Sequence, residues 1–274
     1  MSLTAGRGPF SKQPDGRFNF EPKPPGAALF WYPVPYRVRA FVEGEAVVDS
    51  RRAKLLHETG HLPVYYFPEE DARADLLTPS EKTTHCPFKG DATYRSIRVG
   101  DRVVADAVWA YSDPIESAEF LRGHLALFWK AVDEWLAEDT RLFGHPRDPF
   151  HRIDVWDSTR HVRVLVGGEV VAETRRAKLL AETALPPRYY LPLDDVRREL
   201  LEPSERTTVC AYKGTASYWH VRVRDELEDD LVWTYREPGL DAVPVRGLVC
   251  FFNERIDLEL DGVLQERPRT QWSR

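Results

Sequence analysis

The chain has 274 residues, 42% hydrophobic and 30% charged, a composition typical of a globular protein with enough apolar residues for one large core or two ordinary ones. A net charge of −6 gives no general attraction for nucleic acid, and no apolar run approaches the roughly 18 residues of a membrane span. Three separated cysteines (Cys86, Cys210, Cys250) make no disulfide framework, and Met1 to Phe20 lacks the apolar core of a signal peptide. We therefore expect a reducing, cytoplasmic location.

Residues 1–35 are rich in proline and glycine, with Pro22, Pro24 and Pro25 close together. This composition predicts an extended N-terminal arm that is partly disordered. We expect the aromatic residues between Trp31 and Tyr36 to dock the end of the arm onto the first domain.

The chain then contains two similar copies of one sequence pattern, with each residue of the second copy 124 positions after its counterpart. The longest motif, PSEKTTHCPFKG at residues 79–90, returns as PSERTTVCAYKG at residues 203–214. The string RRAKLL occurs unchanged at residues 51–56 and 175–180. A thiol, an ammonium group and a glycine therefore recur at fixed spacing in each half.

No gap is needed to align the two copies between residues 38 and 128. Such ungapped similarity predicts two homologous domains of one fold, because a period this long is a tandem domain rather than a solenoid. We place the domains at residues 36–139 and 160–274, joined by a linker at residues 140–159, where glycine and proline cluster.

Each half is predicted to contain six to eight short strands and one short helix, which gives a mainly β barrel or folded sheet. The helix is expected to begin at Pro68 and at Pro192, since proline suits the first turn and acidic residues follow it. Residues 116–138 are assigned to strands, because their counterpart at residues 245–261 alternates apolar and acidic residues.

The motifs Tyr-Tyr-x-Pro, Pro-Ser-x-x-Thr-Thr-x-Cys-x-x-Lys-Gly and Val-Trp-x-Tyr occur in this order in both halves. They resemble the domain-of-unknown-function family 427 over nearly all of residues 36–138 and 160–262. The resemblance implies a β-tent fold, shared with methionine sulfoxide reductases of the B type and zinc-bearing Rab chaperones. The family is sometimes labelled nucleotidyltransferase-like. The resemblance implies a fold and a pocket, and no established activity.

The cysteines Cys86 and Cys210 are candidate nucleophiles, because Lys89 and Lys213 follow three residues later and a nearby cation lowers a thiol pKa. The alternative is that each cysteine is a small apolar residue of the core. The residue before each cysteine differs between the halves, which excludes a shared Cys–His dyad. Neither half has a Cys-x-x-Cys pair, so no metal is expected.

The carboxylates Glu58 and Glu182 follow a Leu-Leu pair and lie close to expected core positions. Such a group can act as an acid or base with a raised pKa. It can equally form a buried bridge with Lys89 or Arg51.

The Lys-Gly pairs lack the upstream glycine of a phosphate loop, so a Walker A motif is rejected. A lysine beside a flexible glycine can still hold an anion, and we expect Arg51 or Arg175 to assist Lys89 or Lys213. For the neighbouring residues Arg52 and Arg176 the alternative is a solvated strand end with surface ion pairs.

Aromatic residues recur near these groups and are candidates for a pocket wall, which small-molecule sites commonly use. Strand cores are also rich in aromatic residues, so core packing is the alternative. The candidates are Tyr66, Tyr94, Trp109 and Tyr111 in the first half and Tyr190, Tyr218, Trp233 and Tyr235 in the second.

Taken together, the residues favour a tandem small-molecule-binding protein with one pocket in each repeat for an anionic ligand, nucleotide-like compounds being one class. A catalytic version would use Cys86 or Cys210 as nucleophile and Glu58 or Glu182 as base. The alternative is a non-catalytic protein-interaction module. We expect no cofactor, nucleic-acid or membrane partner, and a monomeric chain whose two domains pack as a pseudo-dimer.

Overall fold

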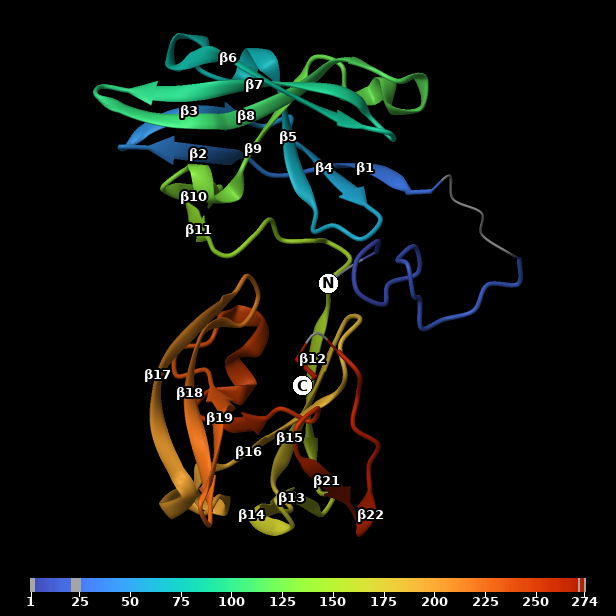
Figure 1. Ribbon diagram of the computed structural model, residues 1–274, viewed down its shortest axis with the longest axis vertical. Helices are drawn as coiled ribbons and strands as arrows, with labels where there is room; N and C mark the ends of the chain where they lie inside the picture. The colour runs from blue at the N-terminus through green and yellow to red at the C-terminus, as the bar shows by residue number, and fades with distance from the viewer. Residues whose placement is uncertain (1–2, 21–25, 271, 274) are drawn as a thin grey trace. The chain divides into compact units, whose positions relative to one another are not determined.

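The computed structural model describes residues 3–20, 26–270 and 272–273, so Pro22, Pro24 and Pro25 of the predicted arm lie outside the described residues. The chain divides into two compact units, Met1–Phe150 and His151–Arg274. Both consist of β-strands and short 3-10 turns (Figure 1). In the described residues no helix is long and apolar enough to cross a membrane.

The first unit contains two antiparallel sheets, one of seven strands in the order β1-β4-β5-β9-β8-β7-β6 and one of four in the order β11-β10-β2-β3. The seven strands are β1 (Leu29–Pro33), β4 (Lys54–Glu58), β5 (Val64–Pro68), β6 (Leu77–Cys86), β7 (Gly90–Val99), β8 (Arg102–Pro114) and β9 (His124–Leu127). The four strands are β2 (Val38–Val42), β3 (Glu45–Ser50), β10 (Glu134–Ala137) and β11 (Thr140–Leu142).

The second unit repeats this arrangement, with a seven-stranded sheet in the order β12-β15-β16-β20-β19-β18-β17 and a four-stranded sheet in the order β14-β13-β21-β22. The seven strands are β12 (Ile153–Ser158), β15 (Ala177–Glu182), β16 (Arg188–Leu191), β17 (Leu201–Cys210), β18 (Gly214–Val223), β19 (Glu226–Thr234) and β20 (Val249–Phe251). The four strands are β13 (Val162–Val166), β14 (Glu169–Thr174), β21 (Asp257–Leu260) and β22 (Val263–Leu264). The prediction of two homologous, mainly β halves is confirmed.

The side-chain alternation of the strands sets which residues enter the core and which face the candidate site. Leu55 and Tyr65 point into the main core of the first unit, together with Val38 of β2. Their neighbours Leu56 and Tyr66 belong to a second apolar cluster instead. Because successive residues of a strand face opposite sides, the Leu-Leu and Tyr-Tyr pairs give one side chain to each cluster.

The predicted short helix is wrong in both halves, since each stretch forms two three-residue 3-10 turns. These are η1 (Glu69–Asp71) and η2 (Ala74–Leu76), with η5 (Leu193–Asp195) and η6 (Arg198–Leu200) in the second unit. The acidic residues do lie in the first turn, after an extended proline. The helix stops because Ala72 and Val196 return to extended backbone and bridge to Val48 and Ala172 of the sheets.

The strands are also more numerous than predicted, since the described residues of each unit form eleven. Within residues 116–138, the predicted strands are found as β9 and β10, and two 3-10 turns, η3 (Glu116–Leu121) and η4 (Trp129–Ala131), accompany them. A seventh 3-10 turn, η7 (Leu240–Val245), stands at the position of η3 in the second unit.

The segments assigned to the arm and the linker also contain structure. Within residues 1–35, Leu29–Pro33 form β1, which pairs with β4. Residues 3–20 form turns, and the Thr59 hydroxyl donates a hydrogen bond to the Phe10 carbonyl at 2.9 Å. Within residues 140–159, β11 pairs with β10 and β12 pairs with β15.

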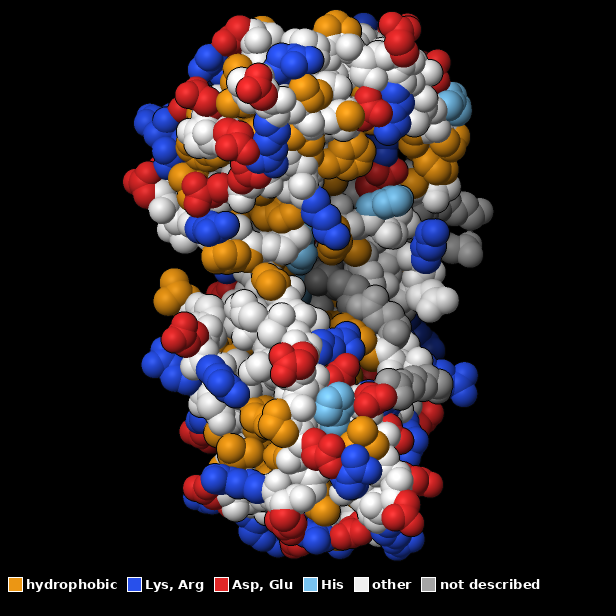
Figure 2. All heavy atoms as spheres, turned by 60° about the vertical axis from the view of Figure 1, so that its left-hand side comes forward, with side chains coloured by type: hydrophobic (Ala, Val, Ile, Leu, Met, Phe, Trp, Pro, Cys, Tyr) orange, Lys and Arg blue, Asp and Glu red, His pale blue; other side chains and the backbone are white. Residues whose placement is uncertain are grey.

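Charged side chains of both signs are interspersed over both units on the face drawn in Figure 2, rather than gathered by sign. Many of them form surface ion pairs, such as Arg102 with Asp133 and Arg222 with Glu202. Exposed pairs of this kind contribute little to stability.

Candidate functional site

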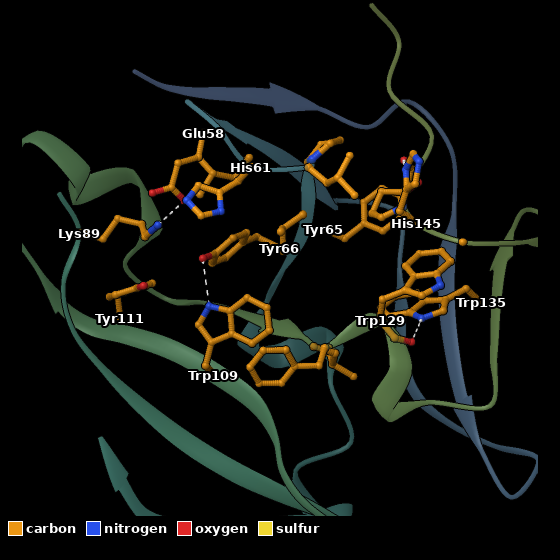
Figure 3. Close-up of a pocket in the computed structure, with 18 of the residues that line it drawn as sticks. Glu58, His61, Tyr65, Tyr66, Lys89, Trp109, Tyr111, Trp129, Trp135 and His145 are labelled. Carbon is orange, nitrogen blue, oxygen red and sulfur yellow. Dashed lines mark hydrogen bonds and ion pairs between the residues drawn. The ribbon is translucent and has the colours of Figure 1, made fainter. Parts of the chain in front are cut away.

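A pocket of about 440 Å³ lies in the first unit, and its walls are mostly aromatic (Figure 3). Glu58, Lys89 and Tyr111 lie at one end, and Trp129, Trp135 and His145 lie at the other, with Tyr66 between them. The size and the few polar groups in an aromatic wall are typical of small-molecule sites. Four predicted wall residues of this half line it, namely Tyr66, Tyr94, Trp109 and Tyr111.

Glu58 and Lys89 form an ion pair at the end of the pocket, so Lys89 is one of the two partners expected for Glu58. Glu58 is the last residue of β4, and Lys89 lies in the turn between β6 and β7, 31 positions further along the chain. Lys89 is only 7% exposed. A buried charge needs such a partner, because the transfer of an unpaired charge from water into the protein interior costs free energy.

The turn that carries Lys89 is fixed by its backbone. The Lys89 amide donates to the Cys86 carbonyl, and the Ile115 amide donates to the Lys89 carbonyl, both at 3.2 Å. Gly90 has φ +99°, and a Cβ there would lie 3.3 Å from the Asp113 carbonyl oxygen. Glycine is therefore required for the turn, because the backbone at the end of β8 approaches it closely.

The phenol of Tyr66 is the polar group at the middle of the pocket. Its oxygen accepts a hydrogen bond from Trp109 Nε1 at 3.2 Å. Burial, and then the neighbouring Tyr111, raise the pKa of Tyr66 well above its ordinary value. Burial also raises the pKa of Tyr111, with the nearby Cys86 and Glu58 adding to the effect. Both phenols therefore stay neutral and can donate or accept hydrogen bonds.

Sequence reasoning missed the other end of the pocket. The rings of Trp129 and Trp135 stack with centroids 4.9 Å apart, and Trp135 Nε1 donates to the Trp129 carbonyl at 3.0 Å. The counterpart of Trp129 is Asn253, a difference that predicts unlike ligand preferences in the two halves, but Trp129 and Trp135 are not among the predicted wall residues. A tryptophan present in one copy alone was the available signal.

The candidate nucleophile Cys86 ends β6 and is half-buried, as is Cys210 at the end of β17. Cys86 packs against the apolar cluster of Tyr66 and Tyr94 and is not among the side chains that line the pocket. The catalytic roles of Cys86, Cys210, Glu58 and Glu182 stay predictions. Cys250 is fully buried, and burial raises its pKa to about 12. No three potential metal ligands converge within the described residues.

The predicted cations at Arg51 and Arg175 are not brought to this pocket. Arg51 lines a separate hollow of the first unit, and Arg175 is an exposed residue. Their neighbours follow the alternative interpretation, since Arg52 pairs with Asp71 and Arg176 pairs with Asp195.

The second unit repeats the ion pair but gives it one more partner. Lys213 pairs with Glu182, and His151 Nε2 lies 3.1 Å from Oε1 of the same carboxylate. Burial alone would raise the pKa of Glu182, but the hydrogen bond from His151 and the charge of Lys213 outweigh it and lower the pKa to about 2. The ring of His151 also stacks on Tyr212 at 3.9 Å.

A second difference is an arginine in the aromatic wall. Arg188 occupies the position of Val64 and makes two hydrogen bonds to Glu254, at 2.8 and 2.7 Å. Its guanidinium lies 5.6 Å from the ring centroid of Trp233 and 5.7 Å from that of Trp272. The space beside Trp233 therefore contains side chains of the chain itself. Sequence reasoning missed all of these partners.

The matched aromatic residues show the consequence. Phe252 is 8% exposed and packs on Trp272, whereas its counterpart Phe128 is 44% exposed. Tyr190 and Tyr218 keep the places of Tyr66 and Tyr94, with Trp233 Nε1 donating to the Tyr190 hydroxyl at 3.1 Å. The two units therefore have matching aromatic residues in the wall, but these residues differ in solvent exposure.

These features define a protein of two homologous, mainly β domains, each of which has its own Lys–Glu pair beside an aromatic wall. Residues 31–138 and 154–262 each match the family described as domain of unknown function 427 (DUF427), and the chain belongs to this family as a tandem repeat. A comparison with curated proteins gives no match.

Proposed function

We propose that the chain is a small-molecule-binding protein whose first repeat holds a planar, nucleobase-like heterocycle in the aromatic pocket. The observation that carries the proposal is the Glu58–Lys89 pair, whose side chains are 14% and 9% exposed, at the end of an aromatic pocket of about 440 Å³. The aromatic walls favour a flat ring, because offset or edge-on aromatic contacts add to the burial of apolar surface.

The ion pair sets the polar edge of the ligand. Lys89 offers hydrogen-bond donors, and the carboxylate of Glu58 beside it offers acceptors. A lactam or imide edge, in which C=O stands next to N–H, is complementary to this arrangement. Because Glu58 neutralises Lys89, this end of the pocket carries no net charge. The proposal therefore does not need the anionic ligand expected from the sequence.

The second repeat supports the same ligand class. There the corresponding space beside Trp233 is filled by the planar guanidinium of Arg188 and the indole of Trp272. Flat groups therefore fit against this wall. In the first repeat Val64 leaves the wall of Trp109 open to a ligand from solution.

The test is calorimetric titration of quinazolin-4-one, a planar lactam, into the full chain. Lys89→Met should weaken binding by about 1–3 kcal/mol, the value of a hydrogen bond to a charged group. The matched variant Lys213→Met should leave binding unchanged. The 3-methyl derivative of the probe, which lacks the N–H, should bind wild-type protein more weakly.

Two results would contradict the proposal. One is quinazolin-4-one binding that is the same in Lys89→Met and wild type. The other is equal affinity for the methylated and unmethylated probes, which would mean that Glu58 accepts no hydrogen bond from the ligand. The second comparison uses the unmodified protein, so it holds even where Lys89→Met loses stability.

A further inference from the structure

A second hollow of the first unit lies at the opposite end of β4 from the Glu58–Lys89 pair. Its volume is about 530 Å³, and its charged lining consists of Arg51, Arg52, Lys54 and Glu70, with His124 beside them. Lys54 and Glu58 are the first and last residues of β4, so their side chains share one face of the strand, about 13 Å apart.

The charges of this hollow do not balance. Arg52 is bound by Glu70, at 2.9 Å, and by Asp71, so both of these carboxylates are already engaged. Neither Arg51 nor Lys54 forms an ion pair with any residue that the structure describes. Asp49 lies close enough to Arg51 for the two charges to interact, but that carboxylate is already bound by Arg37. Among the residues that the structure describes, the two cations of the hollow therefore have no carboxylate of their own, in a chain whose net charge is −6.

The second unit shows how the same motif is neutralised. Lys178, the counterpart of Lys54, forms an ion pair with Asp157 on the neighbouring strand. The residue opposite Lys54 is Pro33, which has no charge. Leu248 also stands in the second unit where the first has His124. The unit with the identical RRAKLL motif thus has a carboxylate where the first unit has none.

We propose that the hollow of Arg51 and Lys54 binds a phosphate-type dianion. A guanidinium can make paired hydrogen bonds to phosphate oxygens, and an ammonium group adds a mobile point charge. An anion here would supply the counter-charge that Asp157 supplies in the second unit. This site uses different residues from the heterocycle pocket, and neither proposal depends on the other.

The experiment titrates inorganic phosphate into the full chain at low ionic strength, with chloride as the competing ion, and follows binding by calorimetry. Arg51→Ala and Lys54→Met should each weaken phosphate binding at least tenfold. The matched variants Arg175→Ala and Lys178→Met should bind phosphate as wild type does. These four side chains are exposed or half-buried, so the variants are expected to fold.

A reciprocal variant transfers the feature that distinguishes the units. Pro33→Asp places a carboxylate opposite Lys54, as in the second unit, and should also weaken phosphate binding at least tenfold. A parallel titration with ribose 5-phosphate identifies the source of the dianion. Tighter binding than phosphate indicates a phosphorylated metabolite, and equal binding indicates free phosphate. Both results support the site.

The proposal is overturned if phosphate binds no better than chloride, or if Arg51→Ala and Lys54→Met both bind phosphate as wild type does. It is also overturned if Arg175→Ala causes the same loss, since the site would then not belong to the first unit. Loss of phosphate binding in Lys89→Met would move the anion to the heterocycle pocket and reject the hollow.

Discussion

The two repeats share an aromatic wall and a Lys–Glu pair beside it, but the described residues of the wall differ in exposure between the two repeats. Phe128 is 44% exposed in the first repeat, and its counterpart Phe252 is 8% exposed in the second. The change from Val64 to Arg188, together with Glu254 and Trp272, accounts for this difference. A shared motif therefore builds the wall, while residues outside the motif decide whether the space beside it is available.

The comparison also separates two kinds of constraint on a buried charge. In the first repeat Glu58 is paired with Lys89 beside the pocket. In the second, Glu182 has His151 as an additional partner, and Arg188 has a carboxylate of its own. The carboxylate of the second repeat is therefore held by two cationic or imidazole partners, whereas Lys89 is the ion-pair partner of Glu58 in the first repeat.

The largest expected effect comes from breaking the Arg188–Glu254 pair. Glu254→Ala would leave the Arg188 guanidinium buried without its partner, since the two side chains are 8% and 0% exposed. We expect the free energy of unfolding of the second unit to fall by about 3–5 kcal/mol. Urea titration with hydrogen exchange of β16 measures it.

The control for this experiment removes both charges. Arg188→Leu combined with Glu254→Leu should cost less than Glu254→Ala alone, because no unpaired charge remains buried. A loss below 1 kcal/mol in Glu254→Ala would show that the arginine is well hydrated, and that the second repeat is not closed by this pair.

The next effect is a dependence of stability on pH that belongs to the second repeat. The pKa of Glu182 is lowered from 4.5 to about 2 in the folded chain. A carboxylate with a lowered pKa gives its full stabilisation above about pH 4.5 and loses it as the pH falls toward 2. One unit of pKa corresponds to about 1.4 kcal/mol, so the change is on the order of 3 kcal/mol.

The measurement compares wild type with Glu182→Gln between pH 7 and pH 2. The destabilisation caused by the substitution should be largest at pH 7 and shrink toward pH 2. Glu226→Gln, at an exposed position of β19, is the control and should give a flat difference. A constant difference for Glu182→Gln across this range would mean that His151 and Lys213 do not hold the carboxylate ionised.

Much of the architecture could be predicted, because two similar copies of one sequence imply two domains of the same fold. The ungapped match between residues 38 and 128 and their counterparts required two copies of one fold, and alternation in residues 257–260 favoured strands. The pairing of Glu58 with Lys89 was one of two weighed alternatives. Arg51, the other alternative, does not pair with Glu58. It precedes β4, whereas Glu58 is the last residue of that strand, and it lines a separate hollow.

The side chains that occupy the space beside Trp233 in the second repeat could not be predicted in the same way. Arg188 and Glu254 are 66 positions apart, and Trp272 lies beyond the matched part of the chain. From sequence alone, an arginine in a strand is normally assigned to the surface. Only the tertiary structure shows that Arg188 is buried and paired with a buried glutamate. The 3-10 turns after Pro68 were missed for a similar reason, because pairing of Ala72 with Val48 ends the turn.

The smallest expected effect concerns the hydrogen bond from indole to phenol that both repeats share. Trp233 donates to Tyr190 at 3.1 Å, and Trp109 donates to Tyr66 at 3.2 Å. Replacing either tryptophan with phenylalanine removes the donor and the same part of the ring. The difference between the two losses of unfolding free energy therefore shows whether the tyrosine hydroxyl finds another hydrogen-bond donor.

In the second repeat Tyr190 is 1% exposed and Trp233 is 7% exposed, so Trp233→Phe leaves a buried hydroxyl without its donor. In the first repeat Trp109 is half-buried at a pocket of about 440 Å³, where water can take the place of the indole N–H. We expect Trp233→Phe to cost about 1 kcal/mol more than Trp109→Phe in urea unfolding of the respective units. Equal costs would mean that the pocket wall of the first repeat excludes water as well as the filled wall of the second does.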